Sequence, residues 1–194
     1  MAGVPKSYVS PVDYLAAERC SPTKSEYLRG EVFAMTGASR EHDLIAVAVS
    51  SALHQPLLTR PCEVYQGDMR VKVSPTGFYT YPDVVVACDN PKFEDEHVDT
   101  LLNPTVIVEV FSESTAGYDR GAKFEHYRRI DSLREYVLIA QDKRHVERFT
   151  RQSDNTWLLW ETNDPQSTVE LTSIACQLRV SDIYAKITFA DQDS

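Results

Sequence analysis

Two short valine-rich runs most constrain what this chain can fold into. They are residues 81–87 (YPDVVVA) and 105–115 (TVIVEVFSEST). Both have the composition of strands buried inside a sheet. Each also carries a carboxylate, Asp83 at the start of the first run and Glu109 within the second. An ionised carboxylate among apolar neighbours is costly unless a cation or hydrogen-bond donors compensate it. Two such strands side by side would supply oxygen ligands for a divalent metal.

Each carboxylate also has a purely structural interpretation. Asp83 follows Pro82, and an aspartate after a proline is common where a strand begins. On a strand, Asp83 would share a face with Val85. Glu109 would face water if its strand lay at a sheet edge, but the apolar residues on both sides of it argue against an exposed edge.

The rest of the chain alternates helical and extended patterns. Two short strands are predicted within 27–35, about a turn at Arg29-Gly30. Strand, helix and strand between 105 and 140 predict a βαβ crossover whose two strands are parallel neighbours. Further helices are predicted at 10–19, 40–58 and 119–130, and further strands at 63–66, 68–73, 78–87 and 133–140, the 68–73 and 78–87 strands forming an antiparallel hairpin. The chain is therefore predicted to be a mixed α/β protein.

After residue 140 the pattern changes to short strands separated by polar turns. Four are predicted, at 145–150, 156–161, 167–171 and 177–180, followed by a short helix at 181–187. They suit an antiparallel meander that either continues the sheet or forms a small arm. The length of 194 residues predicts one domain, 1–194, that includes this meander.

Charge and cysteine usage limit the classes of function. The net charge of −9 argues against a simple nucleic-acid-binding protein, although a basic patch over one site remains compatible with it. The acidic connection at 88–103 is expected to be a solvated loop. The four cysteines are scattered without a C-x-x-C pair, so we expect idle or buried thiols in a reducing cytoplasm. No apolar run has the length of a membrane span, and the N-terminus has no apolar signal segment.

The ordered motifs resemble a known family. Pro82-Asp83 followed by Glu109 in a later strand resembles the pattern of PD-(D/E)XK nucleases. Over residues 27–140 the chain more narrowly resembles the bacterial Uma-type family of restriction endonucleases, through YLRGEVFAMTG with EHDLI, YPDVVVA, VIVEVFSEST and DRGAKFEHYRRIDSLREYVLIA. The resemblance implies a restriction-endonuclease-like mixed β-sheet flanked by helices, with a core at about 27–140 and a C-terminal β extension at about 145–187. It also implies hydrolysis of DNA phosphodiester bonds with Mg²⁺ or Mn²⁺.

One position departs from the superfamily pattern. A lysine is expected two residues after the glutamate, and Phe111 stands there instead. The resemblance suggests that the lysine has moved to the following helix, as Lys123. A helix that starts just past the end of the strand could return a long side chain to the carboxylates. Alternatively, Lys123 is a solvated lysine paired with Asp119, and the site lacks its cation.

The resemblance assigns roles to these residues. Asp83 and Glu109 would hold the metal, and Lys123 would orient a water or stabilise charge on phosphorus. Glu31 would be a further metal ligand, and His42 would contact phosphate or tune a carboxylate; a hairpin-turn glutamate and a helix-start histidine are the structural alternatives. Supporting positions and phosphate contacts are expected from Ser112, Asp119, Tyr127, Arg120, Arg128 and Arg129.

The functional hypothesis is therefore a cytoplasmic Mg²⁺-dependent endonuclease acting on DNA. A homodimer would suit cleavage of both strands, with the C-terminal strands supplying the interface. Two alternatives stay open: a nuclease fold retained as a binding or assembly module, and a metallohydrolase of a smaller phosphate ester, which would better fit the acidic composition.

Overall fold

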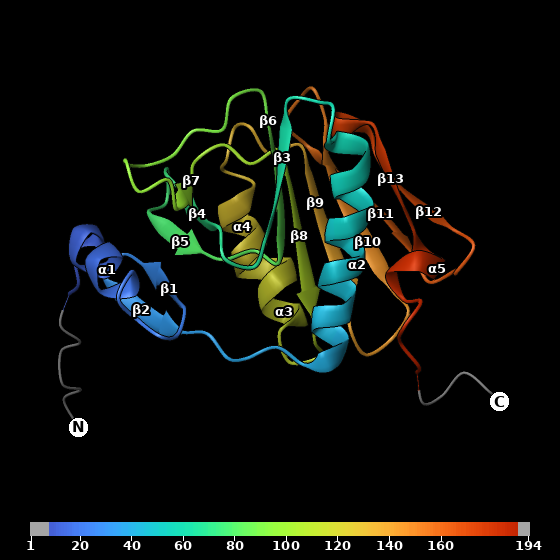
Figure 1. Cartoon of the computed structure of the whole chain (residues 1–194), viewed down its shortest axis with the longest axis horizontal. Helices are drawn as coiled ribbons and strands as arrows, with labels where there is room; N and C mark the ends of the chain where they lie inside the picture. Colours follow the sequence, from blue (N-terminus) through green and yellow to red (C-terminus); the bar gives the residue numbers. More distant parts are fainter. Residues whose placement is uncertain (1–7, 190–194) are drawn as a thin grey trace.

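A six-stranded mixed sheet lies at the centre of the molecule. The computed structural model describes residues 8–189 (Figure 1). The strand order is β11-β10-β9-β8-β6-β3, in which β8 and β9 are parallel and the other pairs are antiparallel. The strands are β3 (Cys62–Gln66), β6 (Val84–Cys88), β8 (Val106–Phe111), β9 (Glu135–Ala140), β10 (Val146–Arg151) and β11 (Trp157–Thr162). The predicted fold class and the parallel crossover between the second run and 133–140 are confirmed.

Helices cover both faces of this sheet (Figure 1). The helix α2 (Arg40–Leu57), capped by Ser39, packs against one face, where Val106, Val108 and Val110 of β8 point. The alternate residues of β8 point to the other face and pack against the crossover helix. All six residues of β8 are buried, so the edge-strand alternative for Glu109 is wrong. No helix in the described part of the chain could span a bilayer.

The crossover between β8 and β9 is not one regular helix. It begins three residues before the predicted start, as α3 (Ala116–Tyr118), continues as a π-helical turn η1 (Asp119–Lys123), and ends as α4 (Phe124–Tyr127). π-helical turns are rare and are frequent at functional sites. Here the turn buries both Asp119 and Lys123, which the composition of the segment alone does not predict.

A second, five-stranded sheet has the order β2-β1-β5-β4-β7. Its strands are β1 (Ser25–Leu28), β2 (Glu31–Ala34), β4 (Arg70–Val73), β5 (Phe78–Thr80) and β7 (Thr100–Leu101). The hairpin of β4 and β5 is confirmed, but the prediction of one strand over 78–87 is wrong. The chain leaves this sheet after Thr80 and enters the six-stranded sheet at Val84. Pro82 has no N–H to give to a ladder, so the break falls there and Asp83 lies between the sheets.

A buried polar network holds the segment that precedes Asp83. Arg70 is 4% exposed, and its Nε and Nη2 donate to the Tyr81 hydroxyl at 2.9 and 2.7 Å. Tyr81 in turn donates to Glu18, at the end of α1 (Pro11–Glu18), at 3.1 Å. The network joins the first helix, β4 and the connection between the two sheets, so it fixes the position of this connection relative to the second sheet.

The acidic connection at 88–103 is not a free solvated loop. Arg19 forms ion pairs with Asp95 and Asp99, both at 2.7 Å, and Lys72 pairs with Glu94. The connection also contributes β7. The expectation of a solvated loop is therefore wrong, because cations far away in the sequence compensate these carboxylates.

The C-terminal strands satisfy both predicted alternatives. β10 and β11 extend the six-stranded sheet, while β12 (Thr168–Leu171) and β13 (Cys176–Arg179) form a separate two-stranded sheet. The short helices η2 (Thr172–Ile174) and α5 (Val180–Ile183) belong to this arm. The fully buried Glu135 of β9 accepts the backbone N–H groups of η2, which fastens the arm to the main sheet.

Two cysteines pair, contrary to the expectation of idle thiols. Cys62 and Cys88 stand directly opposite each other in the β3–β6 ladder and form a disulfide across 26 residues. Cys20 and Cys176 are free. The spacing of the cysteines gives no sign of this pairing, because it depends on the register of two strands.

We expect the Cys62–Cys88 bond to stabilise the fold. Closing a loop of this size removes unfolded-state entropy equivalent to about 3 kcal/mol. Replacing both cysteines with alanine should therefore lower the free energy of unfolding in urea by about that amount, and adding reductant to the natural chain should do the same. Cys20→Ala is the matched control and should change nothing. Equal stability with and without reductant would contradict the prediction.

Candidate active site

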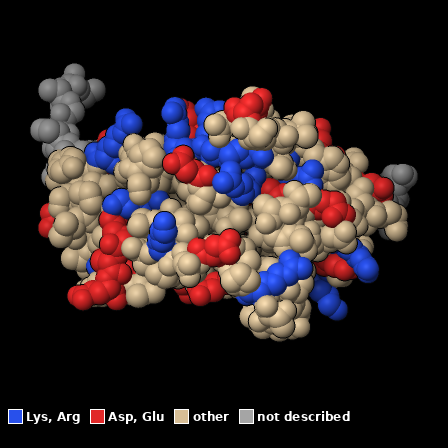
Figure 2. Space-filling model, turned by 90° about the horizontal axis from the view of Figure 1, so that it is seen from above, with Lys and Arg blue, Asp and Glu red and all other residues tan. Residues whose placement is uncertain are grey.

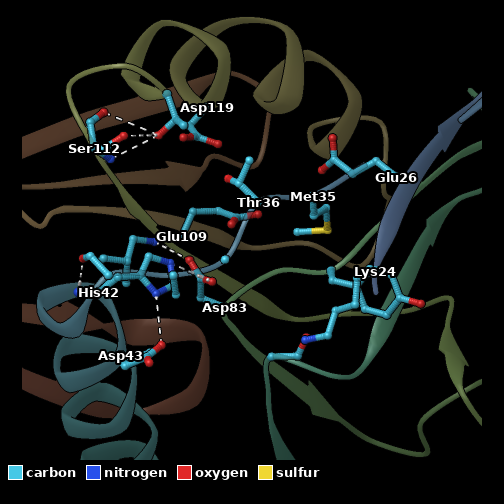
Figure 3. Close-up of a pocket in the computed structure, with 18 of the residues that line it drawn as sticks. Lys24, Glu26, Met35, Thr36, His42, Asp43, Asp83, Glu109, Ser112 and Asp119 are labelled. Atoms are coloured by element: carbon cyan, nitrogen blue, oxygen red, sulfur yellow. Dashed lines mark hydrogen bonds and ion pairs between the residues drawn. The ribbon is translucent and has the colours of Figure 1, made fainter. Parts of the chain in front are cut away.

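A cavity of about 690 Å³, lined by both charged and apolar residues, lies where the two sheets and α2 meet (Figure 3). The hairpin of β1 and β2, the segment 35–39, the start of α2 and the end of β8 contribute to its wall. Asp83, Glu109 and Lys123 all line it, although they come from a connection, a strand and a π-helical turn. The structure therefore brings together the three residues on which the sequence hypothesis depends.

Glu109 is held rigidly at the base of the cavity. It is 4% exposed, and its Oε1 accepts hydrogen bonds from the Lys123 ammonium at 2.8 Å and from the Tyr127 hydroxyl at 2.6 Å. Burial raises the pKa of Glu109 to about 8, even though the nearby lysine acts in the opposite direction.

Lys123 lies among three carboxylates. Its Nζ is 2.8 Å from Glu109, 3.6 Å from Glu26 and 3.7 Å from Asp119. Burial by itself would lower the pKa of Lys123, but these carboxylates raise it above its ordinary value, so the side chain is a cation. The alternative of a solvated lysine is wrong, since only 5% of Lys123 is exposed. Phe111, at the usual lysine position, is buried, and the guanidinium of Arg120 lies over its ring.

Asp83 terminates the ladder between β6 and β8. The last pair of that ladder is Val84 with Val108, so the N–H of Val110 lies beyond it. The Oδ2 of Asp83 accepts this N–H at 2.7 Å, and its Oδ1 lies 3.1 Å from the Nε2 of His42. The carboxylate is therefore anchored by both oxygens beside Glu109, rather than on a strand face beside Val85.

His42 lies in the first turn of α2, where its backbone N–H donates to the capping Ser39 at 3.1 Å. Burial tends to lower the pKa of His42, but the hydrogen bond to Asp83 and the charges of Asp83 and Asp43 raise it overall. The Nδ1 atom is buried without a hydrogen bond, 3.7 Å from the Asp43 carboxylate. The imidazole thus holds Asp83 in place from the side of the helix.

Glu26 is the site residue that the sequence reasoning missed. It lies on β1, is 8% exposed, and accepts hydrogen bonds from Tyr118 at 2.8 Å and from Thr80 at 2.5 Å. Glu31, which we expected as a metal ligand, is exposed on β2 and does not line the cavity. The available signal was weak: Glu26 directly precedes Tyr27, just before the motif that contains Glu31 and just before the predicted strands at 27–35.

The remaining predicted residues occupy supporting positions. Tyr127 donates to Glu109, as described above. Asp119 is 5% exposed, and burial raises the pKa of its carboxyl while Lys123 opposes that shift. Ser112 lines the cavity and gives its backbone N–H to the Thr115 hydroxyl at 3.1 Å, which shapes the turn after β8.

Arg120, which we expected to contact phosphate, does not line the cavity. Its Nε donates to Glu147 at 2.7 Å on β10. His145 and Glu161 lie beside this pair, and one ligand atom from each of His145, Glu147 and Glu161 falls within 4.8 Å of the others. Because the Arg120 guanidinium already neutralises Glu147, we interpret this cluster as an ion-pair network.

Known proteins resemble this chain over most of its length. The Uma2 family, described as "Putative restriction endonuclease", matches residues 11–181. Two uncharacterised proteins of Synechocystis are 35% identical over 164 residues and 33% identical over 183 residues, covering 84% and 93% of this chain and 93% and 94% of theirs. A crystal structure titled as a putative nuclease belonging to DUF820, from Anabaena variabilis, matches with a TM-score of 0.71 at 17% identity, over 85% of this chain and 92% of that one. At that identity, the structural match supports the fold.

Removing the buried ammonium should destabilise the metal-free protein. Lys123→Met leaves the carboxylates of Glu109, Glu26 and Asp119 without their shared cation, and breaking a buried ion pair typically costs about 3 kcal/mol. We expect a loss of that size in urea unfolding at neutral pH with chelator present. Lys143→Met is the matched control, because Lys143 is exposed. Equal losses for the two variants would show that Lys123 is not held as described.

Proposed function

The chain belongs to the Uma2 family, and from this premise we propose that it is a metal-dependent endonuclease that hydrolyses DNA phosphodiester bonds. One observation carries the proposal: Asp83, Glu109 and Lys123, which lie on three different elements, line a single cavity. Chain connectivity alone does not require this convergence. The arrangement suits metal-assisted phosphodiester hydrolysis, in which a bound cation and a fixed ammonium both stabilise charge on phosphorus.

The cavity's charge fits a divalent cation. Its wall contains more acidic than basic side chains: the carboxylates of Glu26, Asp43, Asp83, Glu109 and Asp119 against the ammonium groups of Lys24 and Lys123. Both hydrogen bonds to the Glu109 carboxylate described above go to Oε1. Asp83 and Glu109 would hold Mg²⁺ or Mn²⁺ through their oxygens. When bound, such an ion activates water and stabilises negative charge on phosphorus.

The protein's own groups would position the metal-binding carboxylates and stabilise negative charge on the phosphate. Lys123, which is held by Glu109 at 2.8 Å and lies 3.6 and 3.7 Å from Glu26 and Asp119, would direct an N–H toward a phosphate oxygen or the attacking water. The Tyr127 hydroxyl keeps Glu109 in one orientation. The Val110 N–H and His42 do the same for Asp83. Preorganisation of this kind avoids reorganising charged groups during the reaction.

Nucleic acid would be recognised locally rather than by a broadly basic surface. The net charge is −9, and the view from above in Figure 2 shows acidic and basic side chains intermixed on that face. Lys24, at 42% side-chain exposure, is the lysine on the cavity wall that is open to solvent. A homodimer, which would place two sites on the two DNA strands, completes the proposal. The proposed location is the cytoplasm, where the Cys62–Cys88 bond would be exposed to thiol reductants.

Purified protein should cut DNA when Mg²⁺ or Mn²⁺ is supplied. Asp83→Asn, Glu109→Gln and Lys123→Met should each reduce the cleavage rate by about 100-fold or more, since each removes a charge that acts on the transition state. Glu31→Gln is the matched carboxylate control and should cleave at the natural rate, because Glu31 lies outside the cavity. Gel assays on linear, supercoiled and single-stranded DNA, and on RNA, would measure this. Failure to cut any of them would remove the proposal.

Metal binding separates an enzyme from a binding module with the same fold. Calorimetry with Mn²⁺ should give one binding event that weakens at least about tenfold in Asp83→Asn and is unchanged in Glu31→Gln. Absence of binding, or binding that is independent of Asp83, would instead favour a nuclease fold used for assembly.

A further inference from the structure

The outer edge of the six-stranded sheet is an apolar strand with a neighbour on one side only. Within residues 8–189, β11 pairs with β10 and with no other strand. Its first four residues, 157–160, are WLLW, and Leu158 and Leu159 are 58% and 47% exposed. Edge strands are usually protected by a charge, a proline or a bulge, and these four residues contain no charge or proline. The edge is therefore open to another strand.

The ladder with β10 determines which backbone groups of β11 point outward. The Gln152 N–H donates to the Thr156 carbonyl at 2.8 Å, so the hydrogen-bonded pairs along the hairpin alternate from that position. Residues 158, 160 and 162 direct their backbone groups toward β10. Trp157, Leu159 and Glu161 therefore direct their N–H and C=O groups to the open side.

We propose that β11 is a dimerisation strand that pairs antiparallel with β11 of a second copy of this chain. This inference names the interface of the proposed homodimer. The register follows from the outward groups, because only Leu159 opposite Leu159 of the partner subunit lets all three outward residues pair. Trp157 then pairs with Glu161 of the partner subunit, and Leu158 packs on Trp160 of the partner subunit. The exposed leucines become buried.

Charge complementarity favours a second copy in antiparallel orientation. Arg151 lies over the ring of Trp157 at 4.8 Å, at one end of the β10–β11 hairpin. Glu161, whose side chain is 59% exposed, lies at the other end, while Glu147 opposite it is paired with Arg120. A two-fold axis through Leu159 brings the acidic end of one hairpin beside the arginine end of the other, whereas parallel pairing would place Glu161 against itself.

The other edge of the same sheet is a poorer partner. β3 is five residues long and carries the charged Glu63 as its second residue, next to the disulfide-bonded Cys62. Pairing β11 with β3 of another copy would be a head-to-tail contact, which does not close after two copies. Self-pairing of β11 closes after two copies and joins apolar residues to apolar residues.

Oligomeric state tests the inference without reference to catalysis. In sedimentation equilibrium over a dilution series, the full natural chain should have twice the monomer mass. Leu159→Lys should weaken dimerisation by at least about tenfold, because it places two ammonium groups at the two-fold axis. Leu159→Pro should have the same effect, since it removes an outward N–H but no bond to β10. Val12→Lys, at a residue 75% exposed on α1, is the control and should remain dimeric.

Fluorescence provides an independent readout. The chain has two tryptophans, Trp157 and Trp160, and both lie on β11. Dilution of the natural protein should shift their emission, and Leu159→Lys should show the diluted spectrum at every concentration. Circular dichroism verifies that the variants are folded. If Leu159→Pro is unfolded, the oligomeric state of Leu159→Lys alone tests the inference. A natural chain that is monomeric throughout, or a Leu159→Lys variant that dimerises normally, overturns the inference. Glu109→Gln should remain dimeric, so a catalytic failure leaves this test unaffected.

Discussion

The ion pair between Glu109 and Lys123 is the interaction on which the rest of the site depends. Both side chains are nearly inaccessible to water, and the Coulombic attraction between them must offset the cost of removing two charges from solvent. It does so because further groups converge on the pair: the Tyr127 hydroxyl on the carboxylate, and Glu26 and Asp119 on the ammonium. The buried charge in turn requires β8, the π-helical turn and β1 to keep their relative positions.

The crossover explains how the lysine can leave the strand without leaving the site. A parallel strand pair needs a helical connection over the sheet, and its first turns lie above the end of β8. Within the π-helical turn, Asp119 and Lys123 are four residues apart, and both are buried toward Glu109. Phe111 is thereby free to join the apolar cluster under the helix. The missing lysine at position 111 is a relocation of charge rather than a loss.

Local patterns were predictable and long-range registers were not. Valine-rich runs and helix caps such as Ser39 depend on neighbouring residues, so the main strands and α2 could be predicted. The Cys62–Cys88 bond depends on which residues face each other across a ladder. The choice between Glu26 and Glu31 is of the same kind. The local sequence of the β1–β2 hairpin does not show which of the two glutamates is buried. The pairing of β1 with β5, a strand far away in the sequence, buries Glu26.

The strand order separates the two functional parts of the sheet. Glu109 lies on β8, and β9 and β10 stand between it and the open edge at β11. With strands spaced about 4.8 Å apart, that edge is about 14 Å from β8. A strand added there would contact neither the carboxylates nor Lys123, so dimerisation and catalysis can be altered separately. Two side chains of the crossover link the site to the outer strands. Arg120, three residues from Lys123 in the π-helical turn, reaches Glu147 on β10. Phe124, the residue after Lys123, lies edge-on to Trp157 of β11 with ring centroids 5.2 Å apart, so any coupling between dimerisation and catalysis has these two contacts as its shortest routes.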